Sequence, residues 1–137
     1  MRQIIKTIFI AAPRETVWDF LTDRDKLAIW LNPSETGMVD GEEWRMRSGS
    51  VKMWGRVLEA HPPERLVYSF NHEWLNHDTR VCWELAAKDG GTELTLTHDG
   101  WEGAPGDVEK SVADHDEGWG GHMERLAKLA AEAAGAA

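Results

Sequence analysis

The first third of the chain contains three short segments with a clear apolar pattern. Residues 3–11 alternate with apolar side chains on both faces, which predicts a strand. Pro13 marks the start of a helix, because proline is accommodated in a first helical turn. A second short helix is predicted after Thr22 or Asp23, either of which can cap it, and it ends at residues 32–34.

From Gly37 to His98 the apolar period changes to two, which predicts a run of five or six strands. Turn sequences separate them at residues 48–50, 61–64 and 88–91. The facing of residues 51–60 stays ambiguous, because two alternating sets of apolar side chains compete. The polar segment 71–78, which contains Trp74 and Leu75, is predicted to be a loop of unassigned role.

Apolar residues recur at helical spacing from Val108 to Ala133, which predicts one helix of about 25 residues. Gly118, Gly120 and Gly121 fall in its middle, where each glycine costs about 1 kcal/mol relative to alanine. They would allow a close approach of the helix to the sheet, or they mark a kink.

These elements predict an α+β fold in a single domain spanning residues 1–137. An antiparallel sheet of about six strands needs a cover on one face, and only the last helix is long enough to provide it. The twisted sheet should curl around that helix, and a pocket is expected where the two separate.

Composition narrows the partners of this fold. The net charge of −9 argues against nucleic acid, and no apolar run approaches the ~20 residues of a membrane span, so no membrane insertion is expected. The single cysteine, Cys82, excludes an internal disulfide and falls on the convex face of the sheet. With the first segment interpreted as a strand rather than a signal peptide, we expect a cytoplasmic protein.

Eight tryptophans are present where ordinary composition gives about two. The inward positions of the strands and the last helix therefore suit an apolar or aromatic ligand, although the same side chains would also build a core. Trp30 is expected at the pocket mouth, with the second helix as a lid. The candidate ligand-binding residues are Trp30, Trp44, Met46, Tyr68, Phe70, Trp83, His98, Trp119 and Met123.

His98 continues an inward-facing pattern, so its ring should point into the interior. It would orient a ligand or act as acid or base, or it is a core histidine bonded to a backbone carbonyl. His115 and His122 share a helix face but have too few neighbouring ligands for a metal site. The patch Asp114, Asp116 and Glu117 is interpreted as a solvated face. No catalytic constellation is found, so no catalytic residue, metal or cofactor is assigned.

Three segments carry a family resemblance: residues 61–70 (HPPERLVYSF), 81–100 (VCWELAAKDGGTELTLTHDG) and 117–129 (EGWGGHMERLAKL). They resemble the START-like (SRPBCC) helix-grip superfamily, and more narrowly bacterial proteins similar to the C-terminal domain of the activator of heat-shock protein 90 ATPase. The resemblance covers nearly the whole chain in the same order. It implies a Bet v-like arrangement with a long C-terminal helix packed across a curved sheet.

Three functions follow from the residues and this resemblance together. The first is non-catalytic binding of a small hydrophobic or aromatic ligand between the sheet and the helix. The second is an enzyme of the cyclase or hydrolase type on the same fold. The third is a co-chaperone-like module that activates a chaperone ATPase. A homodimer stays open as a further partnership.

Overall fold

The computed structural model describes residues 2–135, and these form six strands and three helices. In chain order they are β1 (Ile4–Ile10), α1 (Arg14–Thr22), α2 (Arg24–Trp30), β2 (Glu43–Ser48), β3 (Val51–His61), β4 (Arg65–His72), β5 (Thr79–Lys88), β6 (Gly91–Asp99) and α3 (Val108–Ala134). The predicted α+β class, with two short helices after the first strand and a long last helix, is confirmed.

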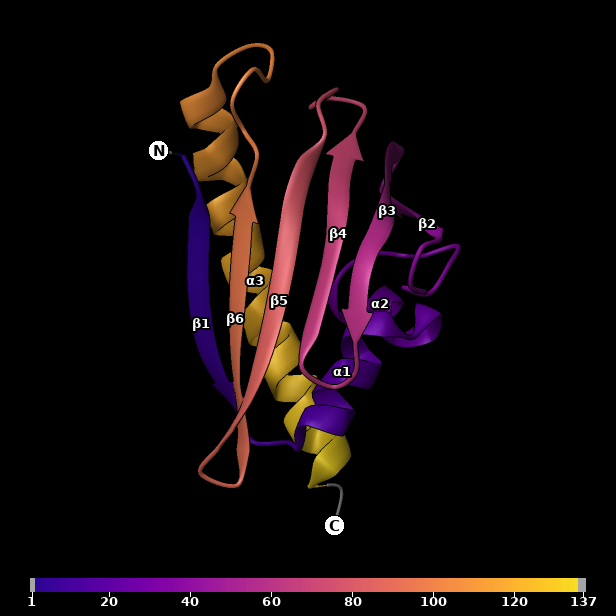
Figure 1. The fold of residues 1–137 in the computed structure, drawn as a ribbon, viewed down its shortest axis with the longest axis vertical. Coiled ribbons are helices and arrows are strands. Elements are labelled where there is room, and N and C mark those ends of the chain that lie inside the picture. Colours follow the sequence, from indigo (N-terminus) through magenta and orange to yellow (C-terminus); the bar gives the residue numbers. More distant parts are fainter. Residues whose placement is uncertain (1, 136–137) are drawn as a thin grey trace.

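The sheet has the spatial order β1-β6-β5-β4-β3-β2, and every neighbouring pair is antiparallel (Figure 1). Strands β2 to β6 form a meander, and β1 joins it at the far edge by pairing with β6. The segment containing α1 and α2 therefore carries the chain from one edge of the sheet to the other. Within residues 2–135, no helix is long and apolar enough to cross a membrane.

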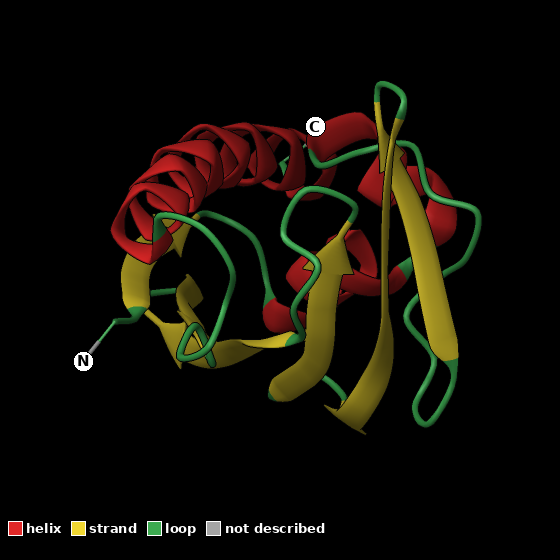
Figure 2. Cartoon of the chain, turned by 90° about the horizontal axis from the view of Figure 1, so that it is seen from above, coloured by secondary structure: helices red, strands yellow, loops and turns green. Residues whose placement is uncertain are grey.

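Helix α3 lies across the concave face of the curved sheet (Figure 2). Its backbone comes closest to β1, α1 and α2. The Nζ atom of Lys6 on β1 lies 2.6 Å from a carboxylate oxygen of Asp116, so one member of the predicted acidic patch ties the helix to the sheet. Toward β4 the helix makes contact through side chains, such as the hydrogen bond between His72 and His115 and the pair of rings Phe70 and Trp119.

Two of the three described helices, α2 and α3, begin at a capping carboxylate. Asp23 accepts hydrogen bonds from the backbone N–H groups of Asp25 and Lys26, each at 3.1 Å, and so begins α2. Asp107 accepts one from Lys110 at 3.1 Å and begins α3. Asp23, rather than Thr22, is therefore the cap of the second helix.

Helix α3 is continuous through its three glycines. A Cβ atom at Gly118 or Gly121 would meet no atom within 4 Å outside the helix backbone, and one at Gly120 would meet only the Lys6 side chain, with Nζ at 3.7 Å. These glycines therefore do not bring the helix against the sheet backbone, and they do not interrupt it. Gly118 differs from the other two in lining a cavity between the helix and the sheet.

The ambiguous strand β3 turns Met53 and Gly55 inward, since they pair with the buried Met46 and Trp44 of β2. Gly55 is required at its position, because a Cβ atom there would collide with the carbonyl oxygen of Ser69. The indole of Trp44 crosses this gap and donates its N–H to the same oxygen at 3.0 Å. The missing side chain thus leaves room for this hydrogen bond, which fixes the orientation of Trp44.

Residues 71–78 are only partly a loop, which corrects the prediction. Asn71 and His72 belong to β4, and the connection proper begins after them. The side-chain oxygen of Asn71 accepts from the backbone N–H groups of His72 and His77, and its amide nitrogen donates to Asp78 at 3.0 Å. Asn71 thus holds the connection in shape, and Leu75 from it enters the core.

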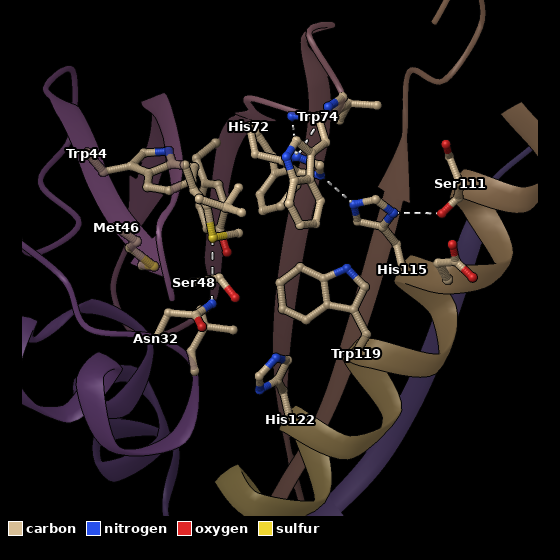
Figure 3. A pocket seen from close by; sticks show the side chains of 18 residues that line it. Asn32, Trp44, Met46, Ser48, His72, Trp74, Ser111, His115, Trp119 and His122 are labelled. Carbon is tan, nitrogen blue, oxygen red and sulfur yellow. Dashed lines mark hydrogen bonds between the residues drawn. The ribbon is translucent and has the colours of Figure 1, made fainter. Parts of the chain in front are cut away.

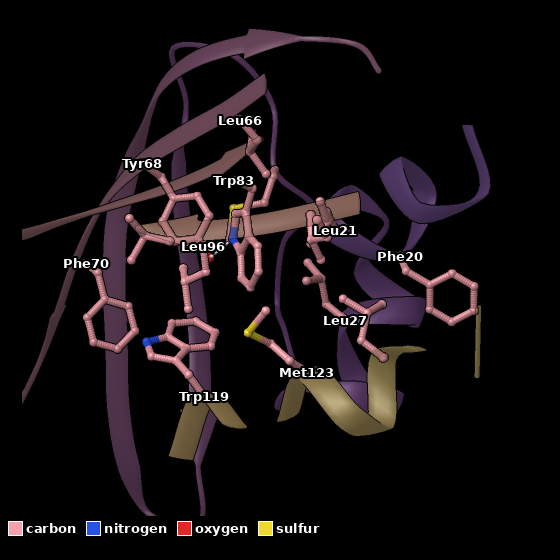
Figure 4. Packing of buried hydrophobic residues seen from close by; sticks show 14 of the residues in the cluster. Phe20, Leu21, Leu27, Leu66, Tyr68, Phe70, Trp83, Leu96, Trp119 and Met123 are labelled. Carbon is pink, nitrogen blue, oxygen red and sulfur yellow. Dashed lines mark hydrogen bonds between the residues drawn. The ribbon is translucent and has the colours of Figure 1, made fainter. Parts of the chain in front are cut away.

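The packed core lies between the sheet and the C-terminal half of α3 (Figure 4). Trp83 is at its centre, with its ring centroid 5.4 Å from that of Trp119 and 6.0 Å from that of Trp30, both edge to face. The indole N–H of Trp83 donates to the Tyr68 hydroxyl at 3.0 Å. Several of the eight tryptophans therefore serve packing, as one of the two interpretations held.

Candidate ligand-binding site

A cavity of about 390 Å³ lies between α3 and the β2–β4 side of the sheet (Figure 3). Its volume lies within the range of small-molecule sites. The sheet contributes Trp44, Met46, Ser48, Val51, Met53, Tyr68, Phe70 and His72. The remaining lining residues are Leu31, Asn32, Trp74, Leu75, Ser111, Asp114, His115, Gly118, Trp119 and His122.

One stripe of α3 forms the helix side of this cavity. Ser111, His115, Trp119 and His122 recur at the spacing that places side chains on one face of a helix. Gly118 stands on the same side, and its missing side chain leaves room that a larger residue would fill. The helical period that predicted α3 therefore also determines which of its residues meet the cavity.

The residues proposed from the sequence divide into two groups. Trp44, Met46, Tyr68, Phe70 and Trp119 line the cavity. Trp30, Trp83, His98 and Met123 lie outside its lining, in the buried core. Whether any of the nine contacts a ligand stays a prediction.

Trp30 is not at the mouth of the cavity, contrary to expectation. It is 1% exposed, and its indole N–H donates to the Phe20 carbonyl at 2.6 Å. This bond anchors the end of α2 to α1 inside the core, so Trp30 does not make α2 a lid. Leu31 and Asn32, the residues directly after it, reach the cavity instead.

His98 belongs to a linear chain of hydrogen bonds that uses both of its ring nitrogens. The Trp119 N–H donates to His98 Nδ1 at 3.0 Å, so the proton of the neutral ring resides on Nε2, which donates to Thr79 Oγ1 at 2.7 Å. Thr79 in turn donates to the Phe70 carbonyl at 2.7 Å. Burial keeps the His98 pKa well below its usual value. His98 is thus a core histidine, bonded to side chains rather than to the expected backbone carbonyl.

A second histidine pair joins the sheet to the helix at the cavity wall. His72 Nε2 and His115 Nε2 are 3.0 Å apart. His72 Nδ1 accepts from the backbone N–H groups of Trp74 and Leu75, each at 3.2 Å, and His115 Nδ1 donates to the Ser111 carbonyl at 2.6 Å. These partners fix both tautomers, so His72 donates to His115.

Both rings of this pair are neutral at pH 7. Burial lowers the pKa of His72 to about 4, with a further contribution from His115, and burial also lowers the pKa of His115. Sequence analysis placed His115 on a helix face but missed His72, because its segment was interpreted as a loop. The alternation of β4, continued by two residues, would have pointed His72 inward beside Phe70.

Trp74 is another lining residue that sequence analysis did not propose. Its side chain is 81% exposed although it lines the cavity, so it lies at the opening. The sequence did contain a sign of this role, because Trp74 is a large aromatic residue inside the polar segment 71–78. A large exposed indole beside an apolar cavity offers a surface for a ligand or for a partner.

The charge distribution of the site is simple. Among the described residues, no lysine or arginine lines the cavity, and its one carboxylate, Asp114, is paired with Lys110 at 2.8 Å. In residues 2–135 no group of three histidine, cysteine or acidic side chains is arranged to hold a metal ion. The cavity wall is therefore apolar and aromatic with neutral polar groups.

A six-stranded antiparallel sheet curved around one long C-terminal helix, with a cavity between them, defines the START-like (SRPBCC) helix-grip fold. The model of one family with this fold, described as Activator of Hsp90 ATPase homolog 1-like protein, matches residues 11–131. The chain belongs to this family.

Solved structures show the same fold. DynU16, from the dynemicin biosynthetic locus, is 24% identical with a TM-score of 0.82, over 93% of this chain and 46% of DynU16. CV1439 from Chromobacterium violaceum is 25% identical with a TM-score of 0.80, over 95% and 97% of the two chains. The Aha1 dimer from Colwellia psychrerythraea is 20% identical with a TM-score of 0.79, over 93% and 94%. A search of curated proteins finds no match.

Proposed function

We propose that this protein binds an uncharged apolar or aromatic small molecule in the cavity between α3 and β2–β4, without catalysing a reaction on it. The observation that carries the proposal is the cavity of about 390 Å³ with Trp44, Phe70 and Trp119 in its wall. Both indole N–H groups are already bonded within the protein, so the rings offer a ligand their apolar faces. We place this activity in the cytoplasm.

The hydrogen bonding of His98, His72 and His115 argues against a catalytic role for these three histidines. A general acid or base needs a ring nitrogen within reach of the reacting group. Both nitrogens of His98 are bonded inside the protein, and so are both nitrogens of His72 and His115. The residue that the enzyme hypothesis relied on, His98, has no nitrogen available to a substrate.

Two glycines of α3 provide a matched test. Gly118 lines the cavity and Gly121 does not, while a Cβ atom at either position would meet no atom outside the helix backbone within 4 Å. The probe is N-phenyl-1-naphthylamine, an uncharged dye that fluoresces in apolar surroundings. We expect saturable binding to the wild-type protein and to Gly121→Leu, and loss of binding in Gly118→Leu, which adds a side chain on the cavity side of the helix. Absence of binding to the wild type, or equal binding by the two variants, would contradict the proposal.

A second candidate function is stimulation of a chaperone ATPase, which the family assignment favours. It requires a protein surface rather than the cavity, so the Gly118→Leu variant should stimulate an Hsp90-type ATPase as well as the wild type does. No stimulation by either protein removes this candidate. Sedimentation of the same samples tests the homodimer, which the dimeric Colwellia psychrerythraea relative suggests.

A further inference from the structure

Three histidines line the cavity, and their ring nitrogens are not equally occupied. His72 and His115 use both nitrogens within the protein, through the bond between them and through backbone partners. His122 uses one, because its Nδ1 lies 3.1 Å from the Trp30 carbonyl oxygen. A carbonyl oxygen only accepts, so Nδ1 carries the proton and Nε2 carries a lone pair.

The Nε2 atom of His122 is accessible. No hydrogen-bond partner for it is found among residues 2–135, whereas every fully buried side-chain nitrogen and oxygen in that range has one. An unpartnered nitrogen on a half-buried ring must therefore be reached from outside the protein. His122 extends from α3 beside Trp119 and faces the cavity (Figure 3).

Burial is the largest influence on the pKa of His122 and lowers it; the hydrogen bond to the Trp30 carbonyl raises it and the charge of Arg125 lowers it, so the net shift is downward and the ring is neutral at pH 7. A neutral imidazole whose Nδ1 proton is bonded to the protein leaves Nε2 as an acceptor and offers a ligand no free donor. Its tautomer is held by the carbonyl of Trp30, the residue at the end of α2 that is anchored in the core. The buried Trp30 thus acts on the site through His122.

In the part of the chain that the structure describes, the lining of the cavity offers an anionic ligand group no counter-charge, because Arg125, whose charge acts on His122, lies outside that lining. Within the described residues the lining contains no lysine or arginine, and its one carboxylate, Asp114, already has Lys110 as its partner. A carboxylate or phosphate would lose its hydration without a compensating charge, and it would meet the lone pair of His122. A hydroxyl or N–H group on an aromatic ring can instead donate to that lone pair at little desolvation cost.

We propose that the cavity selects an uncharged aromatic molecule carrying a hydroxyl or N–H donor, and that His122 Nε2 accepts the hydrogen bond from it. This inference rests on the proposed ligand binding and adds its selectivity. His122 is accordingly a specificity-determining residue, while Trp44, Phe70 and Trp119 supply the contact with the ring system.

The test compares three probes of one ring system by calorimetry at pH 7: 2-naphthol, 2-methoxynaphthalene and 2-naphthoate. We expect 2-naphthol to bind about tenfold more tightly than 2-methoxynaphthalene, the effect of one neutral hydrogen bond. The anionic 2-naphthoate should bind more weakly than both.

Two variants assign the preference to His122. In His122→Phe the affinities for 2-naphthol and 2-methoxynaphthalene should become equal, and His122→Gln, which keeps an acceptor, should restore part of the difference. The exposed His61→Phe is the control and should keep the wild-type preference.

The outcomes separate this inference from the function beneath it. If none of the three probes binds, the proposed ligand binding fails. If 2-naphthol and 2-methoxynaphthalene bind the wild type equally, or if His122→Phe keeps the preference, the cavity binds ligands but His122 does not select them. The wild-type comparison decides this even if a variant does not fold.

Discussion

His98 lies in the middle of a chain of four groups that runs from α3 through β6 and β5 to β4. Each member donates to the next, from the Trp119 N–H to the Phe70 carbonyl. Two of its ends, Phe70 and Trp119, are also lining residues of the cavity. At the scale of single residues, His98 therefore contacts the cavity wall from the core side without belonging to it.

Replacing His98 by leucine should lower the free energy of unfolding by about 2–4 kcal/mol, because Trp119 and Thr79 lose buried hydrogen-bond partners. Urea denaturation measures this loss. The control is Thr95→Ala on the outer face of the same strand, whose hydroxyl bonds only the exposed Thr7, and its cost should stay within about 0.5 kcal/mol.

The same variant tests the role that the sequence suggested for His98. Where His98→Leu is still folded, its affinity for N-phenyl-1-naphthylamine should stay within about threefold of the wild-type value, a change of less than about 1 kcal/mol. A loss of more than about tenfold without loss of structure would return His98 to the ligand site.

At the scale of elements, the pair His72–His115 connects the end of β4 to the first half of α3. Neither ring can take up a second proton and keep its present hydrogen bonds, because all four ring nitrogens are already bonded. Protonated His115 would point an N–H at the N–H of His72, and protonated His72 would point one at the backbone N–H groups of Trp74 and Leu75. The connection therefore exists only while both rings are neutral.

This arrangement predicts loss of stability in acid. The pKa of His72 is about 4 in the folded protein and about 6.5 in the unfolded chain, so the unfolded chain binds more protons between these values. The stability contributed by the pair is complete above pH 6.5 and is lost as the pH falls toward 4. Melting temperatures at pH 7 and pH 5 measure the difference.

The double variant His72→Leu, His115→Leu isolates this effect. Its melting temperature should fall less between pH 7 and pH 5 than that of the wild type, although His98 and His122, whose pKa values are also lowered, keep part of the slope. An equal or steeper fall in the double variant would show that the His72–His115 pair does not cause the acid sensitivity.

At the scale of the whole molecule, the space under α3 is divided into two regions. Beside β1, α1 and α2 the helix packs closely and the interior is filled, and beside β2–β4 a cavity remains. A ligand that binds there stabilises only the folded state. At 100 times its Kd, N-phenyl-1-naphthylamine should add about 2.7 kcal/mol to the unfolding free energy.

Scanning calorimetry with and without the dye measures this linkage. The wild type and Gly121→Leu should melt several degrees higher with the dye, and Gly118→Leu should melt at the same temperature in both conditions. A dye-induced rise in Gly118→Leu would mean that the dye binds elsewhere.

The sequence predicted the elements and their order because each depends on local periodicity. It could not divide the inward residues between core and cavity. Trp83 and Trp44 both face inward from strands, yet only Trp44 lines the cavity, because α3 lies nearer to β1 than to β2. Pairings such as His72 with His115, or His98 with Thr79, depend on the curvature of the sheet, which no local pattern encodes.

The absence of a side chain at Gly55 has a consequence for how this site can change. The Trp44 indole is held by the Ser69 carbonyl across that gap, whereas Met46, Ser48 and Val51 from the same hairpin line the cavity without a side-chain hydrogen bond to any described residue. The Trp44 indole is therefore fixed, whereas the neighbouring lining residues of the hairpin can be replaced. Evolution or a designer can therefore change the shape of the cavity at this hairpin while the Trp44 indole and the packed core stay intact.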